Sequence, residues 1–202
     1  MIHLNLEQLI KSLMTLLNLY EENRTSEFLY ENEAEFCSLY MLLHIHPDNQ
    51  GNSLSLWFRH VPSAIMRSKE MCFARKILRF FRLGNYHRFM HTTQTEASYL
   101  QYCIIESHIN EVRALAICCL NYGGYKPQPF PLADLSKLLV LEYSDVESFC
   151  NDCGLETSVG EAGTRYLPTK QTSFCYPKKR CQKYYPLDSE RLLRLSVDLS
   201  AV

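Results

Sequence analysis

Glycine is scarce in this sequence, with seven residues among 202. Sandwiches and doubly wound sheets need many turns that glycine tolerates best, so its scarcity, together with abundant leucine, favours helices. The net charge is only −1, so no overall charge attracts the chain to nucleic acid or to an anionic membrane. No apolar run approaches the ~20 residues that span a bilayer. These absences indicate a soluble, mainly helical protein, and a hydrophobic fraction of 47% allows a substantial core.

The sequence also lacks the local motifs of enzymes. It contains no P-loop, no Gly-x-Ser-x-Gly, no Gly-x-Gly-x-x-Gly and no His-Glu-x-x-His. The histidines are scattered, and His87 and His91 stand at i, i+4 spacing without a third ligand nearby. We therefore expect no catalytic residue, no metal, no cofactor and no small-molecule substrate.

Nine cysteines, an odd number, are present. Residues 1–20 are apolar, but they lack a charged start and a cleavage site, so they do not resemble a signal peptide. We expect reduced thiols that serve as small apolar side chains. Cys150 and Cys153, followed by Cys175 and Cys181, include one pair at zinc-ligand spacing. Because that pair lies on an apolar helical stripe, a role in the core is favoured over a metal site.

Apolar residues at i, i+3, i+4 and i+7 spacing predict successive helices in the first part of the chain. A helix over 4–20 buries a stripe that includes Leu6 and Leu9, and Asn32 with Glu35 resembles a cap for the next helix. Further helices are predicted around Trp57 and over 63–83, 86–91 and 97–120. Such hairpins stack because each pair leaves an apolar face that it cannot bury alone. Residues 1–125 are therefore predicted to form a helical-repeat scaffold, a TPR-like or PCI-like α-solenoid of stacked hairpins.

The pattern changes after Pro127. Pro131 suits the first turn of a helix, and Ser144-x-x-Glu147 is a capping-box pattern that opens a second one, which Gly154 ends. Two short strands, 157–159 and 165–167, flank a tight turn. This order predicts a winged-helix-like module over 126–175. A basic tail over 176–202, with a short helix at 189–199, follows.

Two groups of basic residues are candidates for contact with an anionic partner. Arg75, Arg79 and Arg82 share one helix face, for which a solvated surface is the default interpretation and contact with phosphate or an acidic partner the alternative. The second group is interleaved with aromatic residues, a pattern that suits single-stranded nucleic acid. Its basic members are Lys170, Lys178, Lys179, Arg180 and Lys183. A nuclear-localisation signal at 178–180 and a solvated tail explain this second group about as well.

The predicted second helix of the winged module, which would enter a DNA groove, carries only acidic charges. They are Asp145, Glu147 and Asp152. Phosphates would repel this helix, so sequence-specific reading of the major groove is not expected, and contact with a partner's module is favoured.

The run Gly-Asn-Tyr-His-Arg-Phe at 84–89 resembles the GNY-x-R-F signature of the Sac-three/GANP family. The resemblance continues in the acidic-aromatic segment 33–43, in 110–113, in 130–132 and in 153–155, and it covers roughly residues 1–175. The residues that carry it are Gly84, Asn85, Tyr86, Arg88, Phe89, Glu35, Phe36, Tyr40, Arg113, Phe130, Pro131 and Gly154. The stretches 30–36 and 54–59 are most similar to a plant member. Members usually carry more helices upstream, so a shortened form is expected.

This resemblance implies a non-enzymatic, PCI-like scaffold of the nuclear complex that couples transcription to mRNA export. It implies a PCI-domain subunit and a small acidic subunit as partners, a location in the nucleus with the cytoplasm as a second site, and no membrane. RNA or single-stranded nucleic acid is a further ligand class. Two alternatives share the fold: an independent winged-helix nucleic-acid-binding regulator, and a PCI-type subunit of the proteasome lid or of translation initiation.

Arg88 is a charge inside an otherwise aromatic motif, so it is expected to need a specific acceptor. Its replacement by glutamate is expected to weaken partner binding or to lower solubility.

Overall fold

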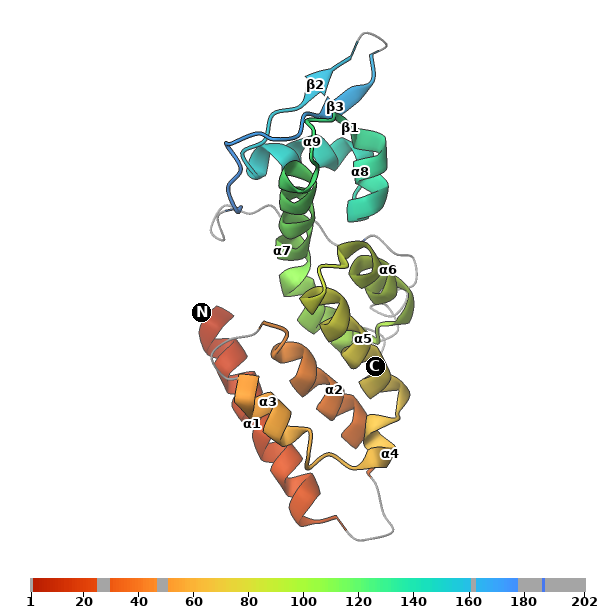
Figure 1. Cartoon of the computed structure of the whole chain (residues 1–202). Coiled ribbons are helices and arrows are strands. Elements are labelled where there is room, and N and C mark those ends of the chain that lie inside the picture. The colour runs from red at the N-terminus through yellow and green to blue at the C-terminus, as the bar shows by residue number, and fades with distance from the viewer. Residues whose placement is uncertain (1, 25–29, 47–50, 161–162, 178–186, 188–202) are drawn as a thin grey trace, which may run out of the picture.

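The computed structural model describes residues 2–24, 30–46, 51–160, 163–177 and 187. Over these residues the chain is elongated and mainly helical, with one small sheet near one end (Figure 1). One half contains α1 (Ile2–Glu22), α2 (Glu33–Leu43), α3 (Gly51–Trp57) and α4 (Ser63–Met66). Next come α5 (Lys69–Arg82) and α6 (Tyr86–Glu96), and α7 (Tyr99–Gly123) leads to the other half. The mainly α fold class is confirmed, and the arrangement is consistent with a helical solenoid.

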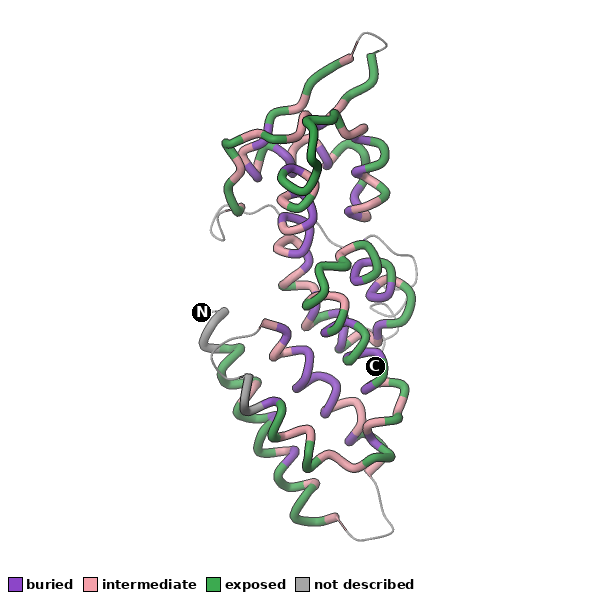
Figure 2. Tube along the Cα trace, in the orientation of Figure 1, coloured by how far each residue is buried: buried purple, intermediate pink, exposed green. Residues whose placement is uncertain are grey.

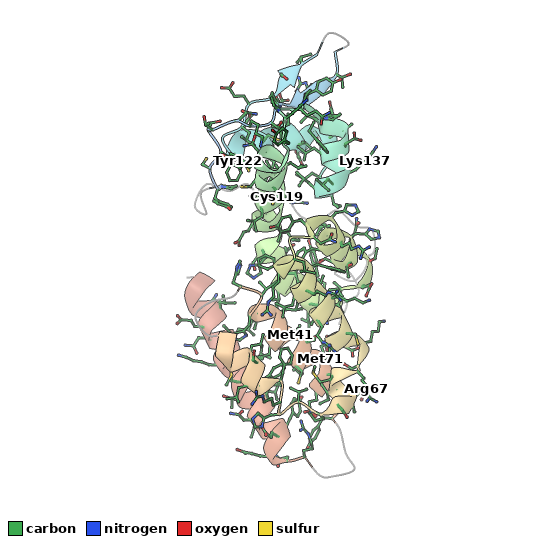
Figure 3. The ribbon with its side chains drawn as sticks, in the orientation of Figure 1. Met41, Arg67, Met71, Cys119, Tyr122 and Lys137 are labelled. Atoms are coloured by element: carbon green, nitrogen blue, oxygen red, sulfur yellow. The ribbon has the colours of Figure 1, made fainter. Side chains whose placement is uncertain are left out.

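Helix α2 is the centre of the first hydrophobic core. It packs against α1, α5 and α7, and Figure 2 shows it mostly buried while the neighbouring α1 is largely exposed. Met41 of α2 and Met71 of α5, both labelled in Figure 3, are buried members of this core. None of the helices within the described ranges has the length and apolarity that crossing a bilayer requires.

The buried stripe predicted on α1 is only partly correct. Leu13 and Leu17 are buried, but Leu6 and Leu9 are 41% and 42% exposed. Helix α1 packs mainly on α2, so only part of its apolar side has a neighbour to cover it.

Two predicted helix caps and the continuity of one predicted helix are wrong in detail. Asn32 precedes α2 but its side chain makes no capping hydrogen bond. The segment predicted as one helix over 63–83 is divided, because the side chain of Ser68 accepts the Met71 N–H and begins α5 as a new helix. The Ser144-x-x-Glu147 pattern makes no capping hydrogen bond, because its helix begins at Tyr143, ahead of Ser144. The Glu147 carboxylate accepts hydrogen bonds from Thr157 and Arg165 instead.

Helix α7 connects the two hydrophobic cores. It begins with a capping box in which Ser98 accepts the Gln101 N–H and the Gln101 side chain accepts the Ser98 N–H. Its middle residues, such as Ile109, belong to the first core, and its later residues, such as Ile117, belong to the second. A single helix therefore couples the helical body to the C-terminal part.

The C-terminal part contains β1 (Phe130–Pro131), α8 (Leu132–Leu139), α9 (Tyr143–Asp152), β2 (Ser158–Val159) and β3 (Arg165–Leu167). The strands pair antiparallel in the order β1-β3-β2, with Phe130 opposite Leu167 and Ser158 opposite Tyr166. The two helices cover a second core with the end of α7. The order α8, α9, β2 and β3 agrees with the predicted two helices and hairpin, and β1 is a strand that the sequence did not predict. The winged-helix-like identity of this part and its boundaries stay predictions. The predicted helix at 189–199 and most of the basic tail lie outside the described residues.

Candidate protein-interaction site

The signature segment 84–89 forms the turn between α5 and α6. Gly84 has φ +66°, a left-handed conformation that suits glycine, and its N–H donates to Phe81 O while the Asn85 N–H donates to Phe80 O. These two backbone hydrogen bonds form a Schellman motif, which satisfies the last carbonyls of α5. The Asn85 side chain then accepts the Arg88 N–H at 3.2 Å and starts α6. The chain thus passes from α5 to α6 within the three residues 83–85.

The aromatic residues of the signature anchor α6 in the interior. Phe89 is fully buried, with its ring centroid 6.2 Å from that of Phe81. Tyr86 is half-buried and contacts both cores, and burial, together with the neighbouring Cys119, raises its pKa. Arg88, in contrast, is exposed and has no ion pair among the described residues, so the acceptor predicted for it is not found there.

Arg113, on α7, is the largest fully buried side chain of the described residues. Its Nε donates to Leu139 O at 3.0 Å and its Nη2 to Val140 O at 2.7 Å, while Nη1 donates to Asn110 Oδ1 at 3.1 Å. The two carbonyls belong to the end of α8, where Val140 has φ +50°. The guanidinium therefore caps α8 and fixes the C-terminal part to α7.

The remaining signature residues also support the fold. Tyr40 is 3% exposed and its ring lies 4.9 Å from that of Trp57, beside the half-buried Glu35 and Phe36 on α2. Phe130 and Pro131 form the edge strand β1. Gly154, with φ +73°, turns the chain after α9. The signature is thus spread over the molecule, with most of its residues half-buried or buried and with Gly84, Asn85 and Arg88 exposed, and the structure does not gather it into one site.

The exposed face of α5 is the strongest candidate for contact with a partner. Arg75, Arg79 and Arg82 all point to solvent from this face, and none has an ion pair among the described residues. The adjacent Lys76 pairs with Glu96 of α6 at 2.8 Å, which joins the two helices. We call Arg75, Arg79 and Arg82 the basic face.

The second predicted basic cluster is mostly untested. Lys178, Lys179, Arg180 and Lys183 lie outside the described residues. Lys170 is exposed, but its ammonium donates to Tyr122 O at 2.7 Å, and its own N–H donates to Asn121 O. Its described contacts hold the chain after β3 against the end of α7.

Burial makes three cysteine thiols resistant to deprotonation. Burial raises the pKa of Cys37, Cys150 and Cys153 to about 12 in each case; the Glu33 carboxylate adds to the effect at Cys37, and the neighbouring Cys150 adds to it at Cys153. Cys150 and Cys153 belong to the second core. Cys175 is exposed, and Cys181 lies outside the described residues.

We therefore expect slow alkylation of these three thiols in the folded protein. Only the thiolate reacts, so at pH 8 a buried thiol with a raised pKa should react at least about 100-fold more slowly than the exposed Cys72 and Cys175. A time course of iodoacetamide labelling, followed by peptide mass spectrometry, measures this. In urea the rates should become equal, and equal rates without urea would contradict the buried positions.

One group of candidate ligands was missed by sequence reasoning. His46 follows α2 while His108 and Glu111 lie on α7, and the donor atoms of the three side chains lie within 4.8 Å of one another. The two histidines are 62 residues apart, so no local spacing indicates the group. His87 and His91, at the spacing noted in the sequence, stack with ring centroids 6.4 Å apart.

Comparisons with known proteins agree with the signature. The family model described as SAC3/GANP family matches residues 1–159. SAC3 family protein B of Arabidopsis thaliana is 31% identical over 163 residues, which cover 79% of this chain and 10% of that protein. The chain thus spans about a tenth of the length of the curated relative that it matches.

Proposed function

The chain belongs to the SAC3/GANP family, and on this basis we propose that it is a non-enzymatic scaffold of a nuclear mRNA-export complex whose basic face binds a small acidic protein subunit. A PCI-domain subunit is the second proposed partner, at the C-terminal winged-helix-like part. Stacked helices suit this role because they present long, rigid surfaces to several partners at once.

The observation that carries the proposal is the local excess of positive charge around α5 and α6. Seven basic and two acidic residues occur between 67 and 96, an excess of five positive charges in a chain whose net charge is −1. The basic ones are Arg67, Lys69, Arg75, Lys76, Arg79, Arg82 and Arg88. Among the described residues only Lys76 of this set has a salt bridge. The other charges are available for an acidic partner.

Arginine is the residue best suited to recognise carboxylates, because its guanidinium presents paired donors in a fixed fork. Each exposed ion pair contributes only about 0.2–1 kcal/mol, but several on one face raise the association rate and orient the partner. Arg75, Arg79 and Arg82 repeat along a single face of α5, so a helix or strand rich in Asp and Glu is complementary to them.

The C-terminal part offers exposed aromatic rings for the second partner. Tyr125 is 98% exposed, Tyr143 51% and Tyr122 47%. Exposed aromatic side chains are enriched at protein interfaces, where they bury large areas at little entropic cost. Helix α9 carries acidic and no basic residues, and Glu147 pairs with Arg165, so the charges there favour a protein over DNA.

A charge-reversal variant tests the basic face. We expect Arg75→Glu/Arg79→Glu/Arg82→Glu to reduce capture of acidic export-complex subunits from nuclear extract by about 10–100-fold, because three attractions become repulsions. Quantitative mass spectrometry of the captured proteins gives the ratio to wild type. All three side chains are exposed, so the variant should fold as wild type does, and circular dichroism checks this.

The matched control reverses three other exposed charges. Lys11→Glu/Arg59→Glu/Lys126→Glu changes the net charge by the same amount away from α5. It should retain capture within about 2-fold. Equal losses in both variants would mean that net charge matters rather than this face, and no loss in either would overturn the proposed interface.

Binding of nucleic acid by the same face is the competing outcome. Fluorescence anisotropy with a single-stranded RNA would then show affinity that falls steeply with salt. The slope of log K against log salt concentration would be about −0.7 for each phosphate neutralised. We expect no RNA affinity that depends on Arg75, Arg79 and Arg82.

A further inference from the structure

Three potential metal ligands converge where the chain leaves α2 and passes the middle of α7. His46 Nε2 lies 3.1 Å from His108 Nδ1 and 3.2 Å from Glu111 Oε2. All three donor atoms are within 4.8 Å of one another, and this is the only such group of His, Cys, Asp and Glu that the described part of the chain contains. The group is therefore compact enough to share one ion.

The fold holds each ligand in place. His108 and Glu111 are three residues apart on α7, which puts them on the same face of the helix. His46 follows α2 closely, and its ring packs edge-on against Phe81 of α5, with centroids 5.2 Å apart and planes at 87°. His46 thus approaches α7 from a separate element, supported by a third one.

The spacing of the atoms fits a tetrahedral metal ion. Zinc binds imidazole nitrogen and carboxylate oxygen at about 2.0–2.2 Å, so neighbouring ligand atoms around it are about 3.3 Å apart. Both distances from His46 Nε2 are close to that value. Two imidazoles and one carboxylate are ligands that suit zinc and related divalent transition metals rather than calcium or magnesium.

Hydrogen bonding alone explains the arrangement less well. Nε2 of His46 is a single ring nitrogen, yet two potential acceptor atoms face it at similar distances. If that nitrogen carries a proton, the two acceptors must share it; if it does not, the carboxylate faces a lone pair. One divalent cation satisfies all three atoms at the same time.

We propose that His46, His108 and Glu111 form a zinc-binding site that fastens the end of α2 to α7. The His46 and Glu111 side chains are 32% and 41% exposed, so an ion enters without unfolding the protein. Three protein ligands leave a fourth position for water or for a group from a partner. This site lies beyond the proposed scaffold function and does not depend on it.

The test uses the untagged full chain, freed of metal by dialysis against a chelator. Titration with Co²⁺ should give visible d–d bands that saturate at one ion per chain, without the near-ultraviolet band of thiolate-to-cobalt charge transfer, and Zn²⁺ should displace them. Zinc at about 100-fold above its Kd should raise the Tm by about 5–10 °C.

Variants separate this site from other histidines and from the cysteines. His46→Ala, His108→Ala and Glu111→Gln should each abolish saturable binding and the Tm shift while leaving the circular dichroism unchanged. The control His87→Ala/His91→Ala removes an exposed pair at helical spacing and should bind as wild type does. The proposal is overturned by absence of saturable binding, by a thiolate band, or by loss of binding in the control instead.

Discussion

Arg113→Ala is expected to lower the free energy of unfolding by about 3–5 kcal/mol. The guanidinium is fully buried and donates to the carbonyls of Leu139 and Val140 at the end of α8. Alanine would leave both carbonyls without these donors and would open a cavity between α7 and α8. An unsatisfied buried carbonyl costs about 1–3 kcal/mol, and the cavity adds to that cost. Urea unfolding followed by circular dichroism measures the change.

Two further variants show whether the buried fork is responsible. Arg113→Lys keeps the charge but replaces the fork with one ammonium, and it should lose about 1–3 kcal/mol. Arg165→Ala removes an exposed arginine, paired with Glu147, and should lose less than about 1 kcal/mol. If Arg113→Ala were no more destabilised than Arg165→Ala, the capping role of Arg113 would be wrong.

The loss of local stability in Arg113→Ala should be greatest in the C-terminal part. Arg113 joins α7 to the end of α8 through the Leu139 and Val140 carbonyls, whereas α2 and α5 belong to the first core. Hydrogen exchange in Arg113→Ala should therefore accelerate most in α8 and α9.

Much of the helical architecture could be predicted because helices depend on local patterns. The helix predicted over 63–83 includes α5, whose Phe73 and Ile77 stand four residues apart and are both buried. The end of α5 at Gly84 was predictable as well, since a left-handed residue there needs no distant partner. Such patterns involve only residues within one or two helical turns of each other in the sequence.

Local patterns gave wrong predictions where residues distant in the sequence determine the hydrogen bonding or the burial. Ser144 and Glu147 match a capping box, but Thr157 and Arg165, from the chain beyond α9, take the glutamate oxygens. Leu6 and Leu9 match a buried stripe, yet burial requires a neighbouring element that these positions lack. Sequence spacing describes one helix and does not say what packs against it.

The candidate sites show the same limit. His46 and His108 are separated by 62 residues, and only the crossing of the chain past α7 brings them together. The acceptors of Arg113 lie 26 and 27 residues further along the chain. The family signature, in turn, marks mostly half-buried or buried residues that support the fold, while the arginines of α5 that carry the proposed interface lie outside it.

Gly154→Ala is expected to lower the free energy of unfolding by about 2–4 kcal/mol. Gly154 has φ +73°, and a Cβ there would lie 2.5 Å from Ser173 O and 3.1 Å from Cys175 Sγ. The first of these atoms is backbone and is held nearby, because the Cys175 N–H donates to Cys153 O at 2.9 Å. An alanine must therefore bear left-handed strain and also displace the segment that closes the second core.

A glycine series separates these two costs. Gly163 has φ +74°, and a methyl group added there would meet no described atom within 4 Å, so Gly163→Ala bears the strain alone and should lose about 1 kcal/mol. Gly123 ends α7 in open space, and Gly123→Ala should gain about 0.5–1 kcal/mol from its higher helix propensity. Chemical denaturation of the three variants measures each change. The excess loss of Gly154→Ala over Gly163→Ala then reports the crowding against Ser173, and equal losses would show that the 173–175 segment does not lie against the turn.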